Sequence, residues 1–79
     1  MITAEVALYP LKTSHASSII DKSINSLQGS KVNYSVNSIN THITGTKEEV
    51  FRCLETMFSE GEGTDNEISM VITITNASY

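Results

Sequence analysis

Three short segments of the sequence carry residue types that could bind a small ligand. Residues 8–10 (LYP) close an alternating apolar run, residues 40–41 (NT) open another, and residues 68–70 (ISM) open a third. Apolar side chains supply affinity for a flat ring, while hydroxyl, amide and backbone groups fix its orientation. Hydroxyls also crowd residues 12–18 (KTSHASS). The pattern predicts a ligand site that includes Leu8, Tyr9, Ser17, Asn40, Thr41 and Met70.

Catalysis and metal binding are not expected from the sequence. His15 and His42 have no second histidine, cysteine or acid at metal-ligand spacing, and the single Cys53 excludes a Cys-x-x-Cys site. No base and acid accompany Cys53 in the pattern of a cysteine nucleophile. The one arginine, Arg52, falls inside an expected helix, whereas an acylphosphatase-like enzyme would need it near the first strand–helix turn. We therefore expect no enzyme activity, no metal and no cofactor.

The candidate residues also have purely structural explanations. Thr41 is a β-branched residue of the kind enriched in strands, and on the sequence alone this explanation is favoured. A tyrosine at a strand end, such as Tyr9, commonly packs its ring and leaves its hydroxyl in water. Ser17 fits a solvated first helical turn. Met57 and Phe58 fall at core spacing on a helix, so both are predicted to be buried.

Hydrophobic periodicity places the three segments on strands that alternate with helices. Alternation of apolar and polar residues predicts a strand over residues 2–9, a hairpin over residues 31–45 that reverses at residues 38–40, and a strand over residues 68–75. Apolar residues three or four positions apart predict helices over residues 14–28 and 47–61. The order is therefore βαββαβ.

Residues that are typical of helix termini support these helix bounds. Ser14 is the predicted N-cap of the first helix, and Gly29 suits the left-handed position after its end. Thr46 and Glu49 have the spacing of a capping box, in which each side chain bonds the backbone amide of the other residue. The second helix is predicted to end near Gly61, because a flexible acidic loop follows it.

Right-handed connections fold this order into a ferredoxin-like α+β domain. We expect one domain over residues 1–79, with a four-stranded antiparallel sheet and both helices on one face. The first strand lies between the third and fourth, so the three candidate segments converge at one end of the sheet. The other face carries hydroxyls with a few apolar groups, which suits either solvent or a subunit contact.

Composition narrows the partners and the location. The chain has five basic and nine acidic side chains, a formal net charge of −4, and no basic stripe that could follow a phosphate backbone. Nucleic acid binding is therefore not expected, and neither is membrane insertion, because no apolar run is long enough. Met1 leads directly into "ITAEVALY" without a basic start or a cleavage pattern, so we predict a cytoplasmic protein.

Three stretches of the chain resemble the YkoF-like group of thiamine-binding proteins. They are "AEVALYPL", "NTHITGTKEEVF" and "NEISMVITIT", and the likeness extends over nearly the whole chain. Its most specific features are the Leu8-Tyr9-Pro10-Leu11 strand end, Thr41 four residues before Gly45, and the strand that starts at residue 68. The segment "KTSHASS" departs from the family pattern.

The resemblance implies a non-catalytic module that binds thiamine or its hydroxymethylpyrimidine part as a ligand, in thiamine uptake or salvage. It also implies that Thr41 contacts the ligand and that Leu8 lies beside it. Some relatives carry two such modules in one chain, so a chain with one module is expected to form a homodimer or homotetramer. The alternatives are a regulatory domain that senses amino acids or a structural oligomerisation module.

Overall fold

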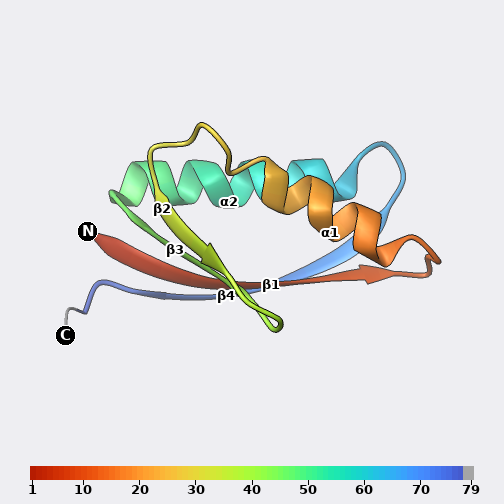
Figure 1. The fold of residues 1–79 in the computed structure, drawn as a ribbon, viewed down its shortest axis with the longest axis horizontal. Helices are drawn as coiled ribbons and strands as arrows, with labels where there is room; N and C mark the ends of the chain where they lie inside the picture. The colour runs from red at the N-terminus through yellow and green to blue at the C-terminus, as the bar shows by residue number, and fades with distance from the viewer. Residues whose placement is uncertain (78–79) are drawn as a thin grey trace.

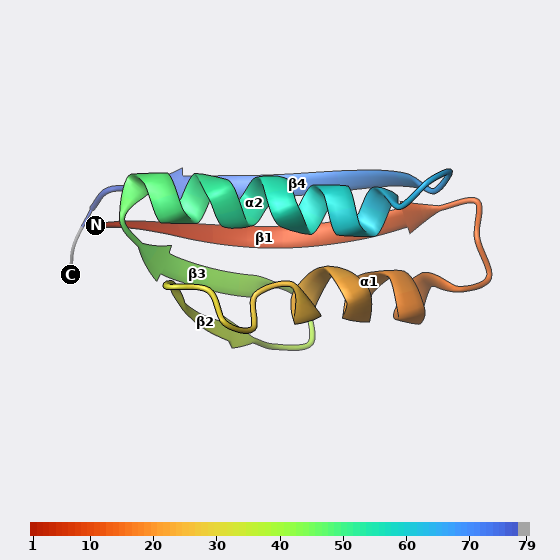
Figure 2. The same cartoon turned by 90° about the horizontal axis from the view of Figure 1, so that it is seen from above.

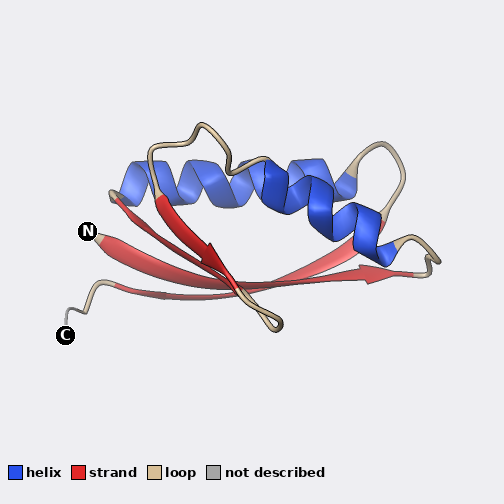
Figure 3. Cartoon of the chain, viewed as in Figure 1, coloured by secondary structure: helices blue, strands red, loops and turns tan. Residues whose placement is uncertain are grey.

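The computed structural model describes residues 1–77, which form four strands and two helices (Figure 1). In chain order the elements are β1 (Ile2–Leu11), α1 (Ala16–Asn25), β2 (Asn33–Val36), β3 (Thr41–Gly45), α2 (Lys47–Glu62) and β4 (Glu67–Thr75). The strands form one antiparallel sheet in the spatial order β2-β3-β1-β4. Both helices lie on the same face of this sheet (Figures 2 and 3), which confirms the ferredoxin-like α+β prediction.

The core lies between the sheet and the helices, as the alternation predicts. Ala4 and Val6 of β1 and Ile43 of β3 point to the helices and are buried, and Val50 and Met57 of α2 pack against them. Removing a large aliphatic side chain from water contributes about 1.5–3 kcal/mol. This single apolar layer therefore holds the helices onto the sheet.

The first strand continues past its predicted end, through Pro10 to Leu11. Its pairing with β3 stops at Val6, opposite Thr41, while its pairing with β4 continues to the strand end. Proline has no amide hydrogen to donate, so it is tolerated where one side of a strand has no partner. Beyond Val6 the β3 side of β1 is thus free of sheet neighbours.

The first helix starts later than predicted, and the prediction that Ser14 caps it is wrong. His15 occupies the N-cap position without a capping side chain, and the Thr13 hydroxyl accepts a hydrogen bond from the His15 amide at 3.0 Å. This local bond fixes the chain in a turn before the helix can begin. The helix ends at Asn25 rather than at residue 28, with Ser26 as a right-handed C-cap, so the predicted helix end is wrong. Gly29 is left-handed, with φ of 80°, but it lies in the turn beyond the helix and not directly after its end.

The predicted capping box at the start of α2 forms in one direction only. The Thr46 hydroxyl accepts a hydrogen bond from the Glu49 amide at 3.2 Å. The Glu49 carboxylate accepts instead from Arg52, one turn later, at 3.1 Å. The helix ends at Glu62, one residue beyond the predicted end, where Gly63 has a positive φ.

The prediction that Phe58 lies in the core is wrong. Its side chain is 37% exposed, and that of Phe51 is 50% exposed. Val50, Cys53, Leu54 and Met57 occupy the inward side of α2, so the two phenylalanines lie on the side toward the edge strand β4. No further element of residues 1–77 covers this side of α2.

Candidate ligand-binding site

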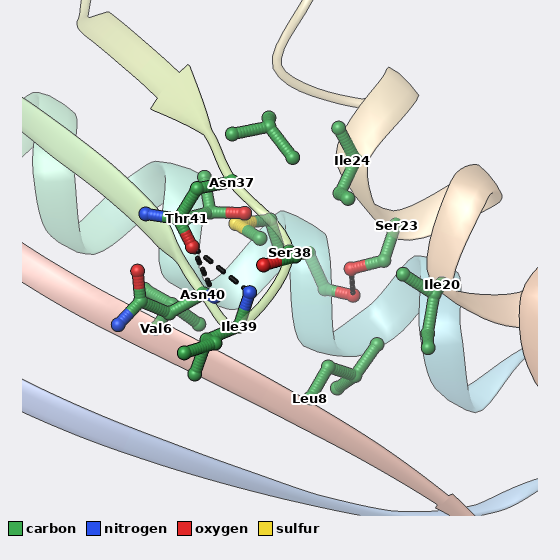
Figure 4. Close-up of a pocket in the computed structure, with 12 residues that line it drawn as sticks. Val6, Leu8, Ile20, Ser23, Ile24, Asn37, Ser38, Ile39, Asn40 and Thr41 are labelled. Atoms are coloured by element: carbon green, nitrogen blue, oxygen red, sulfur yellow. Dashed lines mark hydrogen bonds between the residues drawn. The ribbon is translucent and has the colours of Figure 1, made fainter.

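A cavity of about 110 Å³ lies between α1, the free part of β1 and the turn of the β2–β3 hairpin (Figure 4). Leu8 and Val6 form its floor on β1, and the apolar side chains of Ile20 and Ile24 form the α1 wall. Residues 36–41 form the hairpin wall, and Met57 of α2 closes the interior. The cavity exists because β3 stops pairing with β1 at Val6 and the hairpin turns away there.

The hairpin wall is shaped by a local side-chain bond. Oδ1 of Asn37 accepts hydrogen bonds from the amides of Ile39 and Asn40, both at 2.9 Å, and the Asn37 amide donates to the Asn40 carbonyl at 3.0 Å. Asparagine favours this arrangement because its short side chain reproduces the geometry of a backbone turn. Two of the dashed lines in Figure 4 mark these side-chain bonds, and a further one starts at the Ser23 hydroxyl. The turn thus sets the position of Asn40 and Thr41.

Five polar residues interrupt the apolar lining, and the polar groups of three of them lie where a ligand could bond them. The Thr41 side chain is buried, and its hydroxyl has no hydrogen-bond partner among the described residues. The Ser23 hydroxyl donates to the Met57 carbonyl at 2.8 Å, which leaves its oxygen free to accept. Oδ1 of Asn40 is buried without a partner. A ligand with polar groups on a ring edge would satisfy such groups.

No ionisable side chain is among the described residues that line this cavity. A charged group placed inside would be removed from water without a counter-charge, at a large cost in free energy. Elsewhere in residues 1–77, no three His, Cys, Asp or Glu side chains are grouped so that they could hold a metal ion. The cavity is therefore suited to a neutral, partly apolar group.

A model of the YKOF-related family matches residues 1–78. The chain belongs to this family. No curated protein is significantly similar to it. Within the described residues, no helix has both the length and the apolar character that crossing a membrane requires.

Solved structures share the fold of this YKOF-related chain. Protein SP2199 from Streptococcus pneumoniae is 19% identical with a TM-score of 0.89, covering 98% of this chain and 87% of that one. A domain of unknown function, DUF77, from Bacillus cereus is 23% identical with a TM-score of 0.85, covering 96% and 75%. A candidate thiamine biosynthesis or salvage protein from Thermotoga maritima, TM0486, is 19% identical with a TM-score of 0.70, covering 90% and 80%. At these identities the likeness establishes the fold alone.

The structure brings three of the six predicted site residues of this YKOF-related protein to one cavity, namely Leu8, Asn40 and Thr41. Tyr9 follows Leu8 on β1 and so faces the opposite side of the sheet, where it is 52% exposed. Ser17 is exposed on α1. Met70 pairs with Leu8 across the sheet but does not line the cavity. The three segments thus meet at one end of the sheet, whereas the cavity is lined by residues of only the first two.

Sequence reasoning missed the α1 wall. Ile20 and Ile24 belong to the apolar stripe from which the helix was predicted, and Ser23 lies between them on the same side. A serine within an apolar helical stripe is a signal for a buried polar contact, because buried hydroxyls are nearly always bonded. This signal, applied to residues 20–24, would have indicated the site.

Replacing Ser23 by Ala is expected to lower the free energy of unfolding by about 1 kcal/mol. The Ser23 hydroxyl links α1 to α2 through the Met57 carbonyl, and Ser23 is fully buried. This loss of stability is at the lower end of the range for removing a buried hydrogen bond. The Met57 carbonyl lies within α2 and so keeps its helical hydrogen bond when the serine hydroxyl is removed. Urea unfolding measures the change. The matched control, Ser18→Ala at an exposed position of α1, should leave stability unchanged or slightly raised.

Proposed function

We propose that this protein binds thiamine, or its hydroxymethylpyrimidine part, in the cavity between α1 and β1, without catalysing a reaction. The observation that carries the proposal is the lining of this cavity. It joins Leu8 to Thr41, the two residues that the family resemblance associates with the ligand. Membership of the YKOF-related family and the fold shared with TM0486 support a role in thiamine uptake or salvage.

The volume of the cavity favours one ring over two. An apolar cavity of about 150 Å³ holds benzene, whereas sites that enclose a drug-sized ligand have volumes of about 300 Å³ or more. At about 110 Å³, this cavity is close to the size of a single ring and below that of whole thiamine. We therefore place the pyrimidine inside and the thiazolium ring at the mouth, against Val36 and Ile39, which are 48% and 79% exposed.

The polar groups suit an aminopyrimidine. Thr41 can donate its hydroxyl hydrogen to a ring nitrogen, while the Ser23 oxygen, whose hydrogen is used by Met57, can only accept from the exocyclic amine. The neutral lining matches the neutral pyrimidine and leaves the thiazolium charge, and any phosphate attached beyond it, in water. The proposal thus predicts little discrimination between thiamine and its phosphorylated forms.

Calorimetric titration with thiamine and its two separate halves tests the proposal. We expect thiamine and hydroxymethylpyrimidine to bind with dissociation constants within about tenfold of each other, because the pyrimidine carries the buried contacts. The separated thiazole alcohol should give no measurable heat. The proposal would be contradicted if only the thiazole alcohol bound, or if none of the three compounds bound. Stabilisation only by amino acids in a thermal-shift panel would favour the regulatory alternative instead.

A further inference from the structure

Two hydroxyls that line the cavity between α1 and β1 differ in how freely their hydrogens can turn. Ser23 belongs to the α1 wall, and Thr41 begins β3 on the hairpin wall. A hydroxyl can donate one hydrogen bond and accept others, and its hydrogen rotates to suit its neighbours unless a partner holds it. The partners that each hydroxyl already has therefore decide which ligand groups it can bond.

The hydrogen of the Ser23 hydroxyl is already used. It is donated to the Met57 carbonyl at 2.8 Å, and the Ser23 side chain is fully buried (Figure 4). A buried hydroxyl that gave up this partner would find no water to replace it, and buried polar groups without partners are costly. Toward the cavity, Ser23 is thus fixed as a hydrogen-bond acceptor.

The other polar groups that a ligand could bond in the cavity are able to adapt. The Thr41 hydroxyl has no partner among the described residues, so it can turn either to donate or to accept. No partner holds Oδ1 of Asn40, and a half-turn of its carboxamide presents nitrogen in place of oxygen. Oδ1 of Asn37 is occupied by two backbone amides of the hairpin turn. Ser23 therefore differs from Thr41 and Asn40 in having a fixed role.

An amino group and an oxo group on a pyrimidine ring present opposite hydrogen-bonding patterns. The amino group donates and the ring nitrogen beside it accepts, whereas the oxo group accepts and the ring nitrogen beside it carries a hydrogen. The two groups are nearly equal in size, and both rings are neutral. Neither the cavity volume of about 110 Å³ nor its lining without ionisable side chains can separate them, so hydrogen bonds must do so.

We propose that the cavity selects amino-substituted pyrimidines over oxo-substituted ones, and that Ser23 sets this selectivity. The selectivity presupposes a pyrimidine bound in the cavity and so rests on the proposed function. The fixed Ser23 oxygen accepts a hydrogen bond from the amino group. Opposite an oxo group, either two acceptors face each other or Ser23 must release the Met57 carbonyl. In both cases the complex has one buried hydrogen bond fewer.

Thr41 contributes affinity without this selectivity. Its free hydroxyl can donate to the ring nitrogen of an aminopyrimidine and, after turning, can accept from the hydrogen on the ring nitrogen of an oxopyrimidine. Thr41→Val should therefore weaken the binding of both forms by similar factors. Because Ser23 and Thr41 line the same cavity, this variant is the matched control for Ser23→Ala.

Calorimetric titration of the full chain with thiamine and oxythiamine tests the proposal, because oxythiamine has an oxo group in place of the amino group. The parent should bind oxythiamine about tenfold to a hundredfold more weakly than thiamine, as expected for one unpaired buried group. Ser23→Ala should bring the two dissociation constants to within about threefold of each other, chiefly by weakening the binding of thiamine. Thr41→Val should raise both constants and keep the ratio of the parent.

The ratio of the two dissociation constants distinguishes recognition from damage. A Ser23→Ala cavity that was merely distorted would lose affinity for both compounds and keep the ratio. Equal affinity of the parent for thiamine and oxythiamine, or an unchanged ratio in Ser23→Ala, would overturn the role of Ser23 and leave the proposed function standing. If the parent bound neither compound, the proposed function itself would be refuted, and the selectivity with it.

Discussion

Replacing Thr41 by Val is expected to raise the dissociation constant for thiamine about tenfold to a hundredfold. Valine keeps the branched shape of the side chain and removes only the hydroxyl that lines the cavity. Leaving a ligand group without its hydrogen-bond partner inside the site costs roughly 1–3 kcal/mol of binding free energy, which corresponds to this range of dissociation constants. The unfolding midpoint should stay the same or rise, because the hydroxyl has no partner among the described residues of the protein.

Thr73→Val is the control for this measurement. Thr73 lies on β4, is exposed, and pairs with Glu5 across the sheet, far from the hairpin turn. The same chemical change there should leave the affinity for thiamine unchanged in calorimetry. If the Thr41 variant binds thiamine as tightly as the parent and unfolds at the same midpoint, the hydroxyl serves neither ligand nor fold, and the assignment of Thr41 is refuted.

The fold could be predicted because local signals and long-range packing agree in this chain. Alternation in residues 2–9 places Ala4 and Val6 on the buried face, and the structure has both there. Thr46 marks the start of α2 within one residue because its hydroxyl satisfies a free amide of the first turn. Where two local preferences compete, as at Thr13 and Ser14, the sequence alone did not identify the one that the chain adopts.

The site could be predicted only in part because it depends on where one strand stops pairing. Leu8 and Thr41 lie together since pairing of β1 with β3 ends at Val6, and no sequence signal marks that point. The hydroxyl of Ser17 makes it a candidate in the sequence, but packing decides which side of a helix faces the sheet, and Ser17 is exposed. Packing also explains Phe58. It has the spacing of core residues along α2, but the sheet is too narrow to cover its side chain.

Replacing Ile43 by Ala is expected to lower the free energy of unfolding by about 2–5 kcal/mol. Ile43 is fully buried at the centre of the sheet, between Ala4 of β1 and Tyr34 of β2. Its truncation loses transfer free energy and leaves a void that the surrounding backbone cannot fill. Domains of this size have only about 5–15 kcal/mol of total stability, so the loss is large.

Ile39→Ala separates this burial effect from the chemical change itself. Ile39 is 79% exposed in the hairpin turn, so the same truncation should change stability by less than about 0.5 kcal/mol. Urea unfolding of both variants measures the difference in the free energy of unfolding. The two curves are fitted with one shared slope of free energy against urea concentration. A loss below about 1 kcal/mol for Ile43→Ala would mean that β3 is not packed under the helices as described. A loss of about 2–5 kcal/mol would also loosen the strand that positions Thr41, so Ile43→Ala should bind thiamine more weakly than the parent as long as it remains folded.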